Sequence, residues 1–118
     1  MKTEFKRIGD TMIVSMEGRL DFETAGPLRE DLGKLTRKAK TDSAPRKIIV
    51  NCENLEFVGS SGISSFVQTL KEFNANAPIR PRYANVKSEF KRVIKAYDEA
   101  EMFEFHDNVE RARKSFDN

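Results

Sequence analysis

Two segments of different hydrophobic periodicity meet at Phe57-Val58-Gly59-Ser60-Ser61-Gly62-Ile63. Before it, residues 47–51 contain the β-branched run Ile-Ile-Val, which is too short for a helix and is typical of a central parallel strand. After it, apolar residues recur at the spacing of one helix face: Ile63, Phe66, Val67, Leu70 and Phe73. We therefore predict a buried strand, a tight turn and an amphipathic helix, with the serine pair where the helix begins.

The serine pair at this turn has two interpretations. As helix caps, Ser60 and Ser61 would accept hydrogen bonds from the free N–H groups of the first turn, and Gly59 and Gly62 would keep the turn slim. As a phosphorylation site, one serine would gain about −1.5 to −2 charges at pH 7. Free N–H groups and the helix dipole favour an anion at such a position. Spacing alone does not choose between a cap and a phosphorylation switch.

The composition predicts one domain that spans residues 1–118. The 21 basic and 19 acidic residues leave a net charge of +2, which gives no strong attraction to nucleic acid or anionic lipid. No apolar run approaches the ~18 residues of a membrane-spanning helix, and the first residues lack the apolar segment of a secretion signal. We expect a cytoplasmic protein that inserts into no membrane and contacts no nucleic acid directly.

The remaining sequence predicts alternating strands and helices. Further strands are expected at residues 5–8, 11–16, 79–84 and 102–105, with a turn at Gly9-Asp10 and Gly18 ending the second strand. Further helices are expected at about residues 22–38, after a cap at Asn85, and after the capping box Asp107-Asn108-Val109-Glu110. The order β-β-α-β-α-β-α-β-α predicts an α/β sandwich around a mixed sheet.

The residues that support catalysis or metal binding are sparse. His106 is the only histidine and Cys52 the only cysteine, so a zinc site, another metal site or a cofactor is not predicted. We expect Cys52 to be a packing residue at a strand end. A Ser-His-Asp arrangement would require His106, which we place at the end of the last strand, to reach Ser60 or Ser61. The glycine-serine turn also lacks the lysine and glycine spacing of a phosphate-binding loop, so we do not expect an enzyme.

Two segments resemble STAS domains, and most closely the bacterial anti-sigma factor antagonists. One is Gly18-Arg19-Leu20-Asp21-Phe22-Glu23-Thr24-Ala25, which is similar to the family's Gly-x-Leu-Asp-x-x-Thr-Ala. The other is Leu55-Glu56-Phe57-Val58-Gly59-Ser60-Ser61-Gly62-Ile63, which is similar to apolar-Asp-Ser-Ser/Thr-Gly-Leu/Ile. The resemblance implies a STAS-like sandwich with a mixed central β-sheet and helices packed mainly on one face.

The resemblance also implies a partner-switching function. In such antagonists, a switch kinase that is also the anti-sigma factor phosphorylates the serine after the motif aspartate, and a serine phosphatase reverses the modification. By position the phosphoacceptor is Ser60, and the implied partner-binding residues are Asp21, Gly59, Ser60, Ser61 and Gly62. The sequence departs from the family at Gly59, which stands where aspartate is usual. This change removes one like charge beside a phosphate and also one possible contact to the partner.

Two other functions remain as alternatives. The chain could be a cytoplasmic STAS subunit of a lipid-transport-type ABC assembly, a role that needs no phosphorylation and that Gly59 fits better. An attached sulfate-transporter domain is not expected, because no membrane segment is present. A small hydrolase that uses the serine pair would lack both a base and a metal site.

Overall fold

The computed structural model describes residues 2–20, 25–38, 46–57, 63–77, 79–98 and 103–116. The elements follow the predicted order. They are β1 (Lys2–Ile8), β2 (Thr11–Leu20), α1 (Ala25–Lys38), β3 (Lys47–Phe57), α2 (Ile63–Asn76), β4 (Arg82–Ala84), α3 (Ser88–Tyr97), β5 (Glu104–His106) and α4 (Val109–Ser115). The predicted α/β class with a mixed sheet is therefore confirmed.

The five strands form one sheet in the order β1-β2-β3-β4-β5. β1 and β2 are an antiparallel hairpin, and every later neighbour pairs in parallel. The hairpin turns at Gly9-Asp10 as predicted, and Gly9 adopts a left-handed φ of 61°. The mixed character of the sheet therefore comes from the first hairpin alone.

β2 and β3 extend beyond their predicted ends at residues 16 and 51. The added residues are largely polar but still pair across the two strands, for example Arg19 with Glu56. Gly18 does not end β2 as predicted. It has a φ of 105° and follows a shift in register between Ser15 and Glu17, so the strand bends there and continues.

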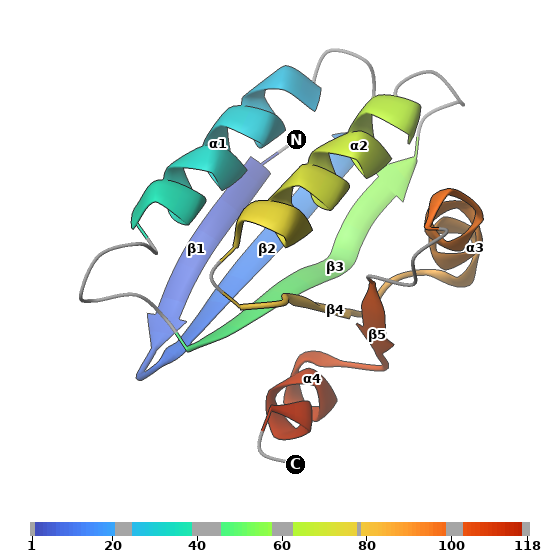
Figure 1. Ribbon diagram of the computed structural model, residues 1–118. Helices are drawn as coiled ribbons and strands as arrows, with labels where there is room; N and C mark the ends of the chain where they lie inside the picture. The colour runs from blue at the N-terminus through green and yellow to red at the C-terminus, as the bar shows by residue number, and fades with distance from the viewer. Residues whose placement is uncertain are drawn as a thin grey trace.

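Three helices cover one face of the sheet and one covers the other, as the resemblance implied. The main core joins α1, α2 and α3 to the strands, and its largest members include Leu28, Phe66, Phe90 and Met16. α1 and α2 run side by side across this face (Figure 1). On the opposite face, Ala112 of α4 packs with Ile49 and Ala84, and Val109 and Phe116 lie against them.

Several predicted element ends are wrong near the C-terminal half. β4 begins at Arg82 because Pro81 has no N–H for the ladder, and β5 includes His106. Asn85 does not cap α3: it has a φ of 57° and donates a hydrogen bond to Asn51 Oδ1 at 2.9 Å.

The other helix starts also differ in detail. α3 starts after Lys87, whose side chain makes no cap. In the capping box, Asn108 is the cap and accepts from the Arg111 N–H at 2.8 Å. The first residues of the predicted first helix, 22–24, lie outside the described residues.

Candidate functional site

The two strands that lead into the family-like segments end beside each other, and the last three residues of each strand belong to its segment. Leu20, the last residue of β2, pairs with Phe57, the last residue of β3. The first segment continues from Leu20 to Asp21, and the second continues from Phe57 towards Ser60. The two segments therefore leave the sheet from neighbouring backbone positions at one edge, where α/β sheets commonly carry their binding sites.

Two helices begin at this same edge. α1 begins at Ala25 and α2 at Ile63, close to the ends of β2 and β3 (Figure 1). Each helix start carries backbone N–H groups without intrahelical partners and the positive end of a helix dipole. In these two described helices, the first turn contains no acidic side chain that would neutralise that positive end.

All the predicted site residues lie outside the described residues: Asp21, Gly59, Ser60, Ser61 and Gly62. The structure describes the residues that border them, which are Leu20 and Ala25 on one side and Phe57 and Ile63 on the other. The strand register shows only that Leu20 and Phe57 are neighbours. That the two segments meet at one site, and the roles of the individual residues, remain predictions.

A hollow of about 270 Å³ lies next to the carboxyl end of β3. Its lining combines the buried side chains of Leu55 and Phe90 with the exposed charged residues Glu56, Lys87 and Glu89. Sequence reasoning missed this surface because it ended the strand at residue 51. The signal was present in Leu55, whose apolar side chain continues the buried face of the longer strand.

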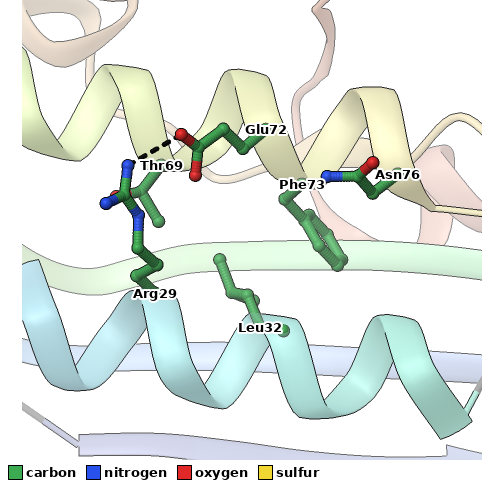
Figure 2. A pocket seen from close by; sticks show the side chains of 7 residues that line it. Arg29, Leu32, Thr69, Glu72, Phe73 and Asn76 are labelled. Atoms are coloured by element: carbon green, nitrogen blue, oxygen red, sulfur yellow. Dashed lines mark hydrogen bonds and ion pairs between the residues drawn. The ribbon is translucent and has the colours of Figure 1, made fainter.

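An ion pair connects the two helices that begin at the site. Figure 2 shows Arg29 of α1 reaching Glu72 of α2, with 2.7 Å between Nη2 and Oε1. The pair lies over a small groove of about 110 Å³, whose other described lining includes Leu32, Thr69 and Phe73. The Arg29 and Glu72 side chains are about half exposed to solvent, so the pair contributes at most about 1 kcal/mol. The spacing of the two helices is set mainly by their buried apolar side chains, which include Leu32 and Phe73.

Comparison with known families decides the identity of this fold. The family model described as "STAS domain" matches residues 2–112. The chain belongs to the STAS domain family. No curated protein sequence matches it.

Solved structures with the same fold come from bacteria and from a mammal. An anti-sigma factor antagonist from Mycobacterium paratuberculosis has a TM-score of 0.74 and 17% identity, over 99% of this chain and 94% of that one. Phosphorylated SpoIIAA, a cell fate determinant from Bacillus, has a TM-score of 0.62 and 18% identity, over 97% and 99% of the two chains. The murine anion transporter Slc26a9 has a TM-score of 0.67 and 15% identity, over 93% of this STAS domain and 18% of the transporter.

His106 of this STAS domain is far from the strand ends that lead into the motifs. It is the last residue of β5, one residue beyond the predicted strand end, and through Ala84 it lies level with Asn51 in the sheet. Asn51 precedes the end of β3 by six residues, about 20 Å at the rise of a strand. Within the described part of the chain, the buried Nε2 of His106 has no hydrogen-bond partner. The described end of β3 is therefore remote from the imidazole, and the serine pair itself lies outside the described residues.

The only thiol of the sequence, that of Cys52, is buried. Cys52 is buried in the main core, and this burial raises the pKa of the thiol from 9.0 to about 12. The expectation of a packing residue is confirmed, although Cys52 lies within β3 and not at its end. Among the described residues, no three His, Cys, Asp or Glu side chains gather as a metal site. None of the helices described is long and apolar enough to span a bilayer.

Proposed function

We propose that this STAS domain is a non-enzymatic anti-sigma factor antagonist in a partner-switching system. It binds a switch kinase that is also the anti-sigma factor, and phosphorylation of Ser60 controls the binding. The observation that carries the proposal is the pairing of Leu20 with Phe57, which starts both family-like segments from one edge of the sheet. Asp21 and the Gly59–Gly62 segment then contribute to one partner-binding surface, and a serine phosphatase resets it.

The mechanism depends on charge at the start of α2. A phosphate on Ser60 adds about −1.5 to −2 charges close to a helix start that carries free N–H groups. The fold can therefore accommodate the anion, and Bacillus SpoIIAA of the same fold has been solved in its phosphorylated form. The partner, in contrast, meets a new dianion at its interface, where an unfavourable charge typically costs several kcal/mol.

Gly59 alters the electrostatics of this switch. The usual aspartate would place one negative charge beside the serine, in both the free and the phosphorylated form. With Gly59 the unmodified surface carries one negative charge fewer. Phosphorylation adds the same charge as it would beside an aspartate, but it adds it to a less acidic surface. We propose that Gly59 changes the choice of partner and leaves the direction of the switch intact.

A second candidate is a cytoplasmic STAS subunit of a lipid-transport-type ABC assembly. Two observations favour it: Gly59 replaces the usual acid, and a STAS-like fold also occurs within the anion transporter Slc26a9. In this function the domain is a structural partner of an ATPase and Ser60 needs no phosphate. Capture of an ABC ATPase with equal affinity by the native and the Ser60→Asp chains would select this candidate.

The test of the main proposal uses a cognate switch kinase, ATP and site mapping by mass spectrometry. We expect a single phosphate on Ser60 of the native chain and none on the Ser60→Ala chain. The Ser60→Ala chain should capture the kinase, and the Ser60→Asp chain should not. Asn108→Asp is the matched control, because it adds the same charge on the other face of the sheet and keeps the cap of α4. Equal capture by all four chains would contradict the proposal.

A further inference from the structure

β1 is an edge strand with an exposed apolar surface. It is the outermost strand of the sheet, and within the described residues only β2 pairs with it (Figure 1). Of the three large hydrophobic side chains found exposed among the described residues, two belong to this strand: Phe5 is 42% exposed and Ile8 is 55% exposed. A long edge with apolar side chains favours pairing with another strand.

The hairpin determines which backbone groups of β1 face outward. Ile8 and Thr11 flank a two-residue turn and pair directly, so they form the hydrogen-bonded pair next to the turn. Hydrogen-bonded and non-hydrogen-bonded pairs alternate along an antiparallel ladder. Lys6 and Glu4 therefore bond to β2, whereas the N–H and C=O groups of Phe5 point away from it.

We propose that two copies of this chain associate through β1, antiparallel, in a register centred on Phe5. Phe5 of each copy then exchanges both backbone hydrogen bonds with Phe5 of the other, and the sheet continues across the two-fold axis. Glu4 lies opposite Lys6 of the second copy, and Lys6 opposite its Glu4. Lys2 lies opposite Ile8 of the second copy.

The charges of β1 select this register. Non-hydrogen-bonded positions are the closer ones across an antiparallel ladder, so the two Glu4–Lys6 contacts bring opposite charges near each other. A register centred on Glu4 would oppose the two Glu4 side chains, and one centred on Lys6 would oppose the two Lys6 side chains. A parallel arrangement in register would oppose like charges at both positions. Only the arrangement centred on Phe5 is complementary at both.

The same register covers the exposed apolar side chains. The two Phe5 rings become cross-strand neighbours on the helix-covered face, where Phe5 already pairs with the buried Val14. On the other face, the aliphatic stem of Lys2 lies across Ile8 of the second copy, and its ammonium stays near Glu4, which it already contacts at 2.9 Å. One seven-residue strand is a small interface, so we expect a weak dimer whose population rises with concentration.

Sedimentation equilibrium of the full chain tests the proposal. The apparent mass should rise with concentration from 13.5 kDa towards twice that value. Lys6→Glu opposes Glu4 with a second acid at both symmetric positions, and Glu4→Lys opposes Lys6 with a second base. Each variant should dimerise roughly tenfold more weakly or worse. An equimolar mixture of the two variants restores opposite charges at both positions and should form a mixed dimer.

Two further measurements make the result specific. Lys114→Glu on α4 makes the same charge change on an exposed residue away from β1 and should leave the association unchanged. The amide of Phe5 should gain protection from hydrogen exchange as the concentration rises, whereas that of Lys6, already bonded to β2, should not change. A native chain that stays at 13.5 kDa, or a dimer that ignores both β1 charge variants, would overturn the proposal.

Discussion

Two glycine-to-alanine substitutions should change the stability of this domain in opposite directions. Gly18 has a φ of 105°, which lies outside the left-handed region that residues with a Cβ can reach at modest cost. Gly18→Ala should therefore lower the free energy of unfolding by about 1–2 kcal/mol. Gly33 lies within α1 with no positive φ, and a Cβ there would meet Arg37 Nη1 at 3.5 Å, an ordinary contact. Gly33→Ala should raise the free energy of unfolding by about 0.5–1 kcal/mol.

Thermal unfolding measures both changes in one assay. For a domain of this size, 1 kcal/mol corresponds to roughly 4 °C in Tm. Gly18→Ala should then melt about 4–8 °C lower, and Gly33→Ala about 2–4 °C higher, than the native chain. The comparison matters for the site because Gly18 shapes the end of β2 that leads into Asp21. If Gly18→Ala has the same Tm as the native chain, the positive φ assigned to Gly18 at the bent end of β2 is wrong.

Three more substitutions or reactions test the core and the attachment of α4. Arg82 binds Glu104 at 3.1 Å and lies 4.1 Å from the Phe116 ring centroid, so Arg82→Met should cost about 1–2 kcal/mol in urea unfolding. If Arg82→Met left the free energy of unfolding nearly unchanged, α4 would be held by its apolar contacts alone. The buried Tyr83 hydroxyl donates to Asn74 Oδ1 at 2.6 Å, so Tyr83→Phe should lose about 1 kcal/mol in the same assay, and an unchanged midpoint would exclude that bond. Because the pKa of Cys52 is about 12, a thiol reagent at pH 8 should label the chain only after unfolding, and rapid labelling of the native chain would contradict the burial.

The fold was predictable because strong local patterns agree with the tertiary structure. The Ile-Ile-Val run and the helical spacing after Ile63 correctly located β3 and α2. The strand ends were harder to predict, because polar residues and a glycine interrupt the apolar pattern of β2 after residue 16 and of β3 after residue 52. These residues are in strands because most of them pair with a residue of the neighbouring strand, as Arg19 pairs with Glu56. That pairing depends on the register of β2 and β3, which no local sequence pattern encodes.

The sequence was enough to locate the two segments of the candidate site, but not to predict how they are arranged in space. The family-like patterns identified the segments that contain Leu20 and Phe57, but only the parallel register shows that these two residues are neighbours. The hollow beside Leu55 and Phe90 joins β3 to the start of α3, which are far apart in the sequence. A contact of that kind follows from the order of strands in the sheet, so residue patterns alone could not reveal it.

The central claim is that negative charge on Ser60, at the start of α2, decides whether the partner binds. Calorimetric titration of the cognate switch kinase with the unmodified and the Ser60-phosphorylated chain tests it most directly. The account predicts that phosphorylation weakens binding by at least about a hundredfold, which corresponds to roughly 3 kcal/mol, while the domain stays folded. Equal affinities for the two folded forms would contradict it.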